Sequence, residues 1–324
     1  MSFLLAGKRS RSIFKRESLV LLVALVVLLA MACDVREPTA SHTSVVTSPH
    51  YPVTVTDTRG TSVVFTEAPK RIVSLSPAHT EVFYALGLGD RIVGRDSYSD
   101  FPPEARLKPK VGGAFNLSLE ALVALEPDLV YTTFETPVAD IEGLGIRVLY
   151  LFPPADVQGV LDNMALIGQV TDREVQAQAL VKEMEARIKA VTDKLAGVEL
   201  RLRTYYEIDP GLWTVGPGSF VGDILQSLHV QNVAEGASSP YPQLSAEVIV
   251  DQDPEIILLG DSKEYLSTGI TVEEVVARHG WSDISAVMEN RVYPFNDSLL
   301  SRPGPRIAEG IEQLAQLLYP ELFQ

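Results

Sequence analysis

The chain has 324 residues, a formal net charge of −15, a hydrophobic fraction of 46% and a single cysteine. So many apolar residues exclude a disordered chain, and one thiol excludes a scaffold held together by internal disulfides. The acidic balance argues against a nucleic-acid partner, because nucleic-acid binders normally carry a basic surface. At this length about two domains are expected.

The first 32 residues have the features of an export signal. Basic residues are followed by the uncharged apolar run 19–32, which is shorter than the roughly 20 residues that span a bilayer. Small residues then lead into Cys33, and the segment 29–33 resembles the signal of bacterial lipoproteins, in which cleavage leaves a lipid-modified cysteine. The alternative is an ordinary signal peptide with an incidental cysteine. In both cases the rest of the chain is expected outside the cytoplasm, in the periplasm or at the outer cell surface, and lipidation would anchor it to the membrane through Cys33.

The following residues, 33–52, are polar and contain Ser, Thr and Pro, which predicts a flexible tether. Alternation of β-branched and polar residues over 53–65, around Arg59-Gly60, predicts a β-hairpin. Short apolar runs then predict buried strands, and capped segments predict helices between them. Strands are expected at 71–75, 91–94, 128–132 and 146–151, with helices at 80–86 and 119–125.

Two helices are expected in the middle of the chain, at 156–170 and 172–196. The second keeps its apolar residues at helical spacing and would be roughly 36 Å long, so it is interpreted as a strut that joins two lobes, or else as a surface helix of one domain. The second half repeats the pattern, with strands at 203–208, 255–259 and 291–295 and helices at 219–228, 246–251, 272–278 and 307–318. Alternating strands and helices predict an α/β fold with mainly parallel sheets covered by helices.

Three segments carry a resemblance to one family. They are Arg71-Ile-Val-Ser-Leu-Ser-Pro-Ala-His-Thr-Glu with its continuation through residues 85–94, Leu119-Glu120 with the following 124–130, and Arg302-Pro-Gly-Pro-Arg306. Over about residues 53–322 the chain resembles the class III substrate-binding proteins of ABC importers for cobalamin, ferric siderophores and haem, the cobalamin-binding members most closely. This resemblance implies the helical-backbone metal-receptor fold, in which one long helix bridges two lobes and the ligand sits between them.

The order of elements and the resemblance together divide the chain. The expected parts are a signal peptide (1–32), a lipid-anchor tether (33–52), an N-terminal α/β lobe (53–155), a helical bridge (156–197) and a C-terminal α/β lobe (198–324). A monomer without a resident cofactor is expected, and its implied partners are an ABC importer permease and a metal chelate: cobalamin, a ferric siderophore or haem.

The resemblance also implies two permease-docking residues. In the cobalamin-binding members one glutamate on each lobe docks onto arginines of the permease, and the matching motif positions are Glu120 and Glu247. Each follows a serine in the first turn of a predicted helix. A glutamate there also stabilises the helix by about 0.3–1 kcal/mol, so helix capping is the alternative role.

Ligand contacts are expected in the loops at the carboxyl ends of the strands. Aromatic faces in these loops would suit a large flat chelate. By the resemblance, Tyr98 and Tyr241 are the best candidates, because each lies in a segment similar to one of the cobalamin-binding proteins. These proteins carry tryptophan where Ala114 and Thr133 stand here.

The neighbouring Phe115 and Phe134 could replace these tryptophans as ligand contacts. Asp297 and Arg302 lie in the last loop, where the family places polar ligand contacts. Arg302 could bind a carboxylate or phosphate in a fork, or it could form a structural ion pair.

A direct metal site is not expected, because the five histidines show no ligand spacing. Haem needs one axial ligand, for which His79, Tyr98 and Tyr241 are candidates. No catalytic residues are expected: Gly-x-Ser-x-Gly and phosphate-loop motifs are missing, and Gly216–Ser219 is interpreted as a strand-to-helix turn. An enzyme on a chelatase-like fold and an adhesion lipoprotein are the competing classes, and a binding protein is favoured over both.

Overall fold

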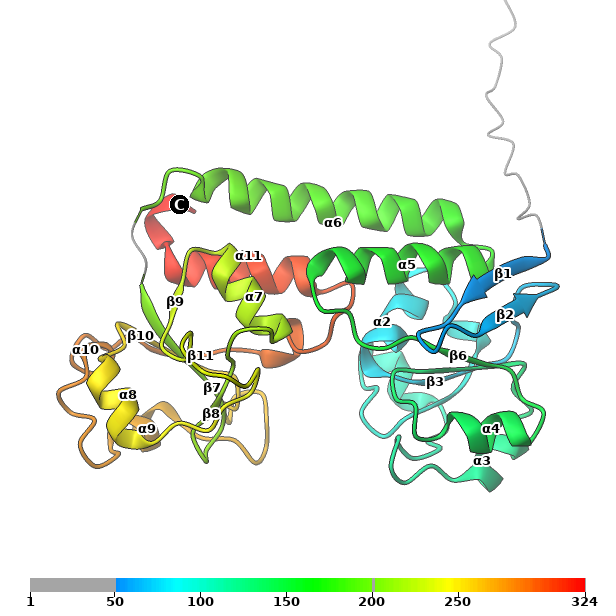
Figure 1. Ribbon diagram of the computed structural model, residues 1–324, viewed down its shortest axis with the longest axis horizontal. Coiled ribbons are helices and arrows are strands. Elements are labelled where there is room, and N and C mark those ends of the chain that lie inside the picture. The colour runs from blue at the N-terminus through cyan, green and yellow to red at the C-terminus, as the bar shows by residue number, and fades with distance from the viewer. Residues whose placement is uncertain (1–50, 200–201, 324) are drawn as a thin grey trace, which may run out of the picture. The chain divides into compact units, whose positions relative to one another are not determined.

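Two β-sheets, each covered by helices, form the main layers of the protein (Figure 1). The computed structural model describes residues 51–199 and 202–323. Cys33, the expected signal peptide and nearly all of the expected tether lie outside these residues.

The first sheet contains four parallel strands in the order β4-β3-β5-β6. Together with the elements packed on it, this sheet is called the N-lobe. The hairpin β1–β2 precedes it and pairs antiparallel, Val53 opposite Phe65, as predicted. The bounds are β1 Val53–Thr56, β2 Ser62–Phe65, β3 Ile72–Leu75, β4 Ile92–Arg95, β5 Leu129–Thr132 and β6 Val148–Tyr150, with helices α2 Pro77–Ala85, α3 Leu119–Ala124 and α4 Val138–Gly143.

The second sheet has the order β11-β10-β7-β8, and β9 also pairs with β7. Together with its surrounding elements it is called the C-lobe. Every pairing in this sheet is parallel except that between β7 and β8. The bounds are β7 Arg203–Asp209, β8 Trp213–Thr214, β9 Gln231–Asn232, β10 Ile256–Leu259 and β11 Val292–Pro294, with helices α7 Phe220–Ser227, α8 Ala246–Gln252, α9 Val272–Val276 and α10 Ser285–Met288.

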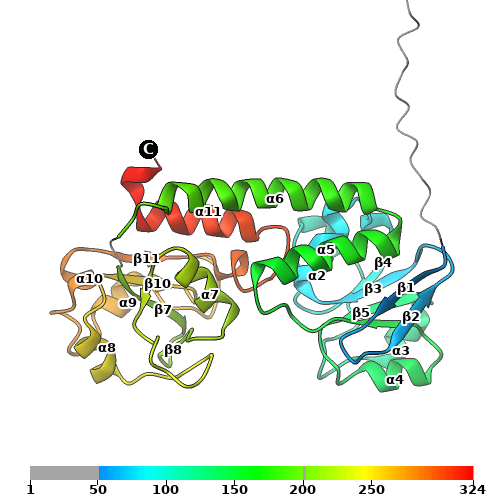
Figure 2. The same ribbon diagram turned by 45° about the horizontal axis from the view of Figure 1, so that its top comes forward.

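Three helices form a layer shared by both lobes (Figure 1, Figure 2). They are α5 (Val157–Thr171), α6 (Glu174–Leu195) and α11 (Ile307–Leu318), and α6 packs against the other two. Asp172 adopts a left-handed conformation with φ 62°, which separates α5 from α6. Arg187 of α6 donates to both carboxylate oxygens of Glu312 on α11, at 2.9 and 2.6 Å. The long helix therefore bridges the lobes, as the sequence predicts.

The hydrophobic core has one shared part and two local parts. The shared part lies beneath α5, α6 and α11 and takes side chains from both sheets, such as Ile72 of β3 and Leu258 of β10. Successive residues of a strand face opposite sides of the sheet, so Val73 and Ile257 belong instead to local cores under α3–α4 and under α8–α10. Because both faces of each sheet are covered, the central strands β3, β5 and β10 have mainly apolar sequences.

Some elements differ from the sequence-based prediction. Helix α2 begins at Pro77 and not near Thr80, because proline is favourable in the first helical turn and Ser76 occupies the N-cap position. Helices α4 and α10 and the two-residue strands β8 and β9 were not predicted. Each is too short to show a hydrophobic period.

Residues 51–199 and 202–323 belong to one compact unit. The expected boundaries at residues 155 and 197 within this unit remain predictions. No helix in residues 51–199 or 202–323 is long and apolar enough to cross a membrane.

Candidate functional site

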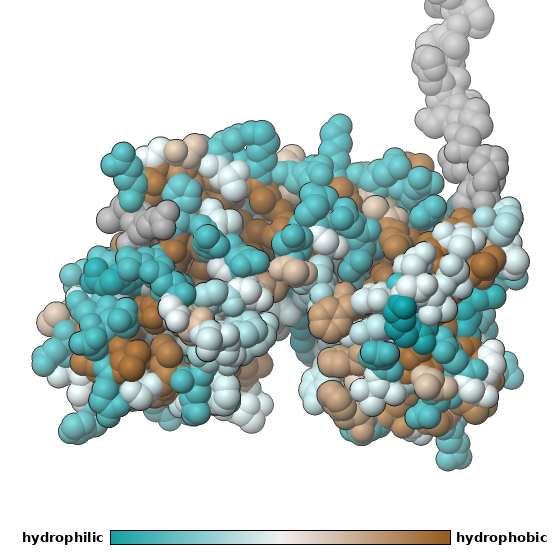
Figure 3. Space-filling model, viewed as in Figure 1, coloured by the Kyte–Doolittle hydropathy of each residue, from teal (hydrophilic) through white to brown (hydrophobic). Residues whose placement is uncertain are grey.

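A large, mainly apolar pocket lies between the two lobes. Its volume is about 720 Å³. One wall is Phe152–Ala155, in the loop after β6 of the N-lobe, and the other walls come from the C-lobe. Figure 3 shows the surface hollowed between the lobes, with apolar side chains in tan and brown on the N-lobe side. A pocket of this size and character fits an apolar small molecule or part of a macrocycle.

Two of the predicted ligand residues, Tyr241 and Asp297, line this pocket. Tyr241 is half exposed. Asp297 begins a short 3-10 turn, η3 (Asp297–Leu299), and its Oδ1 accepts a hydrogen bond from the Tyr206 hydroxyl at 2.8 Å. Burial raises the pKa of Asp297, although the Tyr206 hydroxyl and the charge of Arg302 oppose that shift. A polar group held this way in an apolar wall can fix the orientation of a ligand.

Phe152 is a pocket residue that the sequence-based analysis missed. Its side chain is 61% exposed, which is unusual for a phenylalanine, and it lines the pocket. The sequence did indicate a possible pocket position here, because residue 152 follows the carboxyl end of the predicted strand 146–151. That loop was not included among the predicted ligand loops.

The other predicted aromatic residues lie on N-lobe loops and are not among the residues that line this pocket. Tyr98 is 72% and Phe115 81% exposed, and Phe134 is also exposed. The rings of Phe115 and Phe134 contact each other edge to face, with centroids 5.6 Å apart. The two residues that were expected to compensate for missing tryptophans are therefore brought together.

Hydrogen bonds hold the backbones of these loops while the rings remain exposed. Buried Asp96 accepts from the backbone N–H groups of Tyr98 and Ser99 at 3.2 and 2.7 Å. The Thr132 hydroxyl, at the end of β5, accepts from the N–H of Phe134 at 3.1 Å. Exposed aromatic rings on fixed backbones favour a binding role, because such rings lose little freedom when they bind.

Arg302 forms ion pairs that link the two lobes. Its Nη1 lies 2.6 Å from Asp100 and 3.5 Å from Glu81, both in the N-lobe. The neighbouring Arg306 donates to both Glu81 oxygens at 2.8 and 2.6 Å, and its guanidinium lies 4.0 Å from the centroid of the Phe101 ring. This arrangement is the structural alternative considered for Arg302, and any ligand contact by Arg302 would compete with these pairs.

His79 is poorly placed to serve as an axial ligand. It is buried in α2, its Nδ1 lies 3.0 Å from the Ser76 hydroxyl, and its ring packs against Tyr131 at 4.3 Å. Burial lowers its pKa to about 3, so it stays neutral. Within residues 51–199 and 202–323, no group of three or more His, Cys, Asp or Glu side chains could hold a metal ion.

The two predicted docking glutamates occupy equivalent positions in short helices. Glu120 lies in the first turn of α3 and Glu247 in the first turn of α8, and both are exposed. Neither forms an ion pair within the part of the chain that the structure describes. Helices α3 and α8 belong to different lobes, so the two carboxylates are presented by different lobes.

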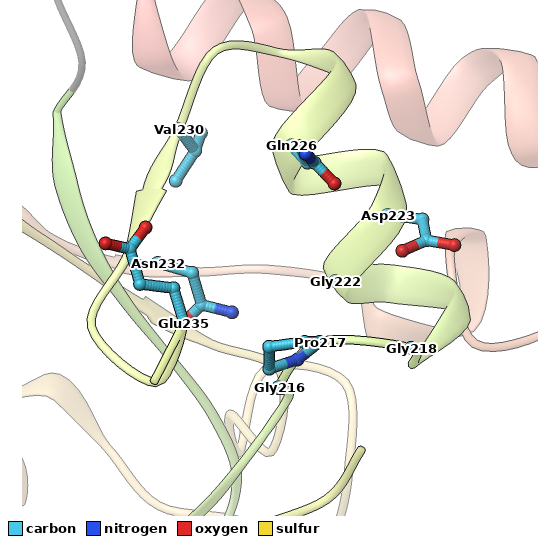
Figure 4. A pocket seen from close by; sticks show the side chains of 9 residues that line it. All are labelled: Gly216, Pro217, Gly218, Gly222, Asp223, Gln226, Val230, Asn232 and Glu235. Carbon is cyan, nitrogen blue, oxygen red and sulfur yellow. The ribbon is translucent and has the colours of Figure 1, made fainter. Parts of the chain in front are cut away.

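A smaller pocket of about 290 Å³ lies in the C-lobe at the start of α7 (Figure 4). Gly216–Gly218 form part of it, and Ser219 caps α7 by accepting from the Gly222 N–H at 3.0 Å. The segment is thus a strand-to-helix turn, as predicted. The pocket is lined by the carboxylates of Asp223 and Glu235 and by no cation among the described residues, so it does not fit a phosphate group.

A buried carboxylate lies in the loop after β10. Asp261 is 3% exposed, and neither of its carboxylate oxygens has a hydrogen-bond partner. Burial, with repulsion from Glu207, raises its pKa to about 7. Glu207 is itself paired with Arg278, which donates to both of its oxygens at 2.6 Å. The Arg278 charge opposes the shift in Asp261 but does not cancel it.

We expect the substitution Asp261→Asn to stabilise the protein at pH 8 and to have little effect near pH 4. A carboxyl with a raised pKa in the folded state favours folding only while it is protonated, so stability is lost as the pH rises from about 4 to about 7. Removing the charge should recover about 2–4 kcal/mol above that range. Urea unfolding at both pH values measures the effect, and an equal change at the two pH values would contradict it.

Two α/β lobes with a common helical layer and an apolar pocket lined from both define a two-lobed binding protein. The model of the periplasmic binding protein family matches residues 72–299. The chain belongs to this family, which consists of substrate-binding transport proteins and not of enzymes.

Curated relatives and solved structures agree with this assignment. The chain is 33% identical over 284 residues to an uncharacterized ABC transporter substrate-binding lipoprotein of Bacillus subtilis (strain 168), covering 85% of this chain and 88% of the relative. It is 30% identical over 294 residues to a cobalamin-binding protein of Halobacterium salinarum, covering 87% and 78%. A haem-binding periplasmic protein from Roseiflexus sp. RS-1 matches with a TM-score of 0.69 and 25% identity, covering 78% of this chain and 99% of that one.

Proposed function

We propose that this chain is the substrate-binding lipoprotein of an ABC importer and that it captures cobalamin, or a related metal chelate, between its lobes. The observation that carries the proposal is the apolar pocket of about 720 Å³ that both lobes line. The similarity to a cobalamin-binding protein over most of both chains supports the choice of ligand. Tyr98, Phe115, Phe134, Tyr241 and Asp297 are the proposed contacts, and we add Phe152 because it lines the pocket.

The charge of the pocket favours cobalamin over haem. Among the described residues that line it, Asp297 is the only acid and no Lys, Arg or His is present. Haem carries two propionates, which would find no cation there and would be repelled by an ionised Asp297. Cobalamin instead carries neutral amides around its ring, and an amide N–H can donate to the Asp297 carboxylate. Arg302, the predicted anion partner, already pairs with Asp100 and Glu81.

Haem remains the second candidate because of Tyr241. Its phenol lines the pocket, and one tyrosine can serve as the axial ligand of haem iron. A ferric siderophore is the third candidate and would use the same aromatic faces. Delivery to a permease through Glu120 and Glu247, and attachment to the membrane through Cys33, complete the proposal.

Titration of residues 34–324 with cyanocobalamin, haemin and a panel of ferric siderophores tests the ligand. Trp213 is half exposed on the C-lobe and Trp281 is buried, so we expect quenching of Trp213 fluorescence by the bound chelate. We expect binding of cyanocobalamin with a dissociation constant on the order of 1 μM or tighter, confirmed by calorimetry. Tyr241→Ala should weaken it by about tenfold, the usual effect of truncating an aromatic anchor.

The results separate the candidates. Binding of haemin alone, with a haem absorption spectrum that changes in Tyr241→Phe, would favour the second candidate. Failure of every ligand to bind would refute the chelate class and reopen the question of catalysis.

A further inference from the structure

The segments that contain Glu120 and Glu247 repeat one pattern in the two lobes. The first reads Ser118-Leu-Glu-Ala-Leu-Val-Ala-Leu-Glu-Pro-Asp, and the second reads Ser245-Ala-Glu-Val-Ile-Val-Asp-Gln-Asp-Pro-Glu. A serine, a glutamate two residues later, a buried aliphatic residue and an acid-Pro-acid ending occupy the same places in both. Each segment leads directly into a central strand, β5 in the N-lobe and β10 in the C-lobe.

The backbones of the two segments follow the same course. Ser118 and Ser245 each accept a hydrogen bond from the N–H three residues later, at 3.2 and 3.3 Å. Past the end of each helix, one acidic residue adopts a left-handed conformation, Glu126 with φ 46° and Asp253 with φ 43°. Few residues other than glycine adopt this conformation, so its recurrence at matching positions marks a duplicated structural module.

In each copy of the module, an arginine side chain donates a hydrogen bond to the backbone just past the end of the helix. Arg71 directly precedes β3, and its Nε donates to the carbonyl oxygen of Glu126 at 2.9 Å. Arg203 begins β7, and its Nε donates to the carbonyl oxygen of Asp253 at 3.0 Å. The two arginines lie on different lobes and are far apart in sequence, yet each donates a hydrogen bond to the carbonyl oxygen of the left-handed residue.

The backbone of each arginine is fixed in the same way. The Arg71 N–H donates to the Asp128 carboxylate at 3.0 Å, and its carbonyl accepts from the Asp128 N–H at 2.9 Å. The Arg203 N–H donates to the Glu255 carboxylate at 3.0 Å, and its carbonyl accepts from the Glu255 N–H at 2.8 Å. The acid after the proline, Asp128 or Glu255, thus fixes the backbone of the arginine. The guanidinium group of the same arginine then reaches the end of the helix.

These contacts matter because α3 and α8 are short. Helices of this length are not stable by themselves, and their last carbonyl groups lack partners within the helix. Each arginine supplies a charged donor to that end, while the glutamate lies at the opposite end of the same helix. The direction of each glutamate is therefore coupled to an arginine contact about two helical turns away.

We propose that Arg71 and Arg203 are positioning residues, which set the direction and separation of Glu120 and Glu247 by fixing the carboxyl ends of α3 and α8. This inference rests on the proposed docking role of the two glutamates. Neither arginine lies in the ligand pocket. Paired charges across an interface set register, so a change in the separation of the glutamates would impair docking without changing ligand capture.

Spin-label distances test the inference without a permease. The mature chain with Cys33→Ser receives labels at Glu120→Cys and Glu247→Cys, and pulsed electron–electron double resonance gives the distance distribution. We expect a broader distribution when Arg71→Met and Arg203→Met are added. Arg291→Met is the matched control, because Arg291 also directly precedes a C-lobe strand, β11, but its guanidinium pairs with Glu289 and donates no hydrogen bond to either module among the described residues. The control should leave the distribution unchanged.

Two further measurements distinguish positioning from stability. Arg71→Lys with Arg203→Lys keeps a charged donor and should restore a narrow distribution, even where the methionine variants fold poorly. An unchanged distribution in the methionine variants, whatever their melting temperature, would overturn the inference. Ligand titration tests the proposed function independently of the distances. If the wild-type chain bound no ligand, the proposed function would be refuted, but the distance result would still hold.

Discussion

Replacement of both Glu120 and Glu247 by alanine is expected to abolish ligand uptake and to leave ligand affinity nearly unchanged. The two carboxylates are exposed, unpaired within the described residues and not among the residues that line the pocket. Each contributes to the fold as an acid in the first turn of a helix, which is a small effect for an exposed side chain. Uptake of radiolabelled cobalamin by membranes that carry the importer measures the first effect, and calorimetry on the purified variant measures the second.

Glu174→Ala is the matched control for this experiment. Glu174 is also an exposed acid in the first turn of a helix, α6, and forms no ion pair among the described residues. Its removal should cost the same small helix stabilisation and leave uptake intact. Uptake that survives in the double variant, or that falls equally in the control, would show that the glutamates do not dock. Each single variant should retain part of the activity, because one charge can still direct the encounter.

The order of the main elements could be predicted because it depends on local patterns. Both faces of β3, β5 and β10 are covered, so their sequences are mainly apolar runs that mark strands. The long helix α6 has buried residues at Ala177, Met184 and Val191, a spacing of whole heptads. Among the elements that were not predicted, β8 and α10 have four residues or fewer and depend on the neighbours they pack against.

The candidate site was harder to predict, because its geometry depends on which loops meet. Tyr241 and Asp297 were expected at strand ends and do line one pocket. Phe115 and Phe134 were expected to serve together, and their rings touch. The sequence could not show that Arg302 pairs with Asp100, some 200 positions away, because an ion pair between lobes leaves no periodic pattern in the sequence. Asp261 escaped notice for the same reason, because its burial is set by the tertiary structure.

The motif Arg302-Pro-Gly-Pro-Arg306 therefore has a physical meaning beyond a family resemblance. It joins the C-lobe to α2 of the N-lobe at the start of α11. A side chain at Gly304 would bring its Cβ within 2.9 Å of the Ala78 carbonyl oxygen, so only glycine lets the two segments approach this closely. The contact places Arg306 against Glu81, whose side chain is almost fully buried. Burial raises the pKa of Glu81, and its hydrogen bond with Arg306 opposes that shift.

Breaking this buried pair is expected to destabilise the fold strongly. Arg306→Met leaves the Glu81 carboxylate buried with only the more distant Arg302 at 3.5 Å. Loss of one partner of a buried ion pair typically costs about 3–5 kcal/mol, and Arg302 should place this case near the lower end. Urea unfolding at pH 7 measures the change.

The double variant Glu81→Met with Arg306→Met gives the sharper test, because the cost arises from the unpaired charge and not from the missing attraction. Replacing both partners of a buried pair by apolar side chains of similar volume is often nearly neutral. We therefore expect the double variant to recover most of the stability lost by Arg306→Met. A double variant that is less stable than either single variant would mean that the ion pair itself holds the lobes together. A single-variant loss below about 1 kcal/mol would mean that solvent screens the pair, as at an exposed surface.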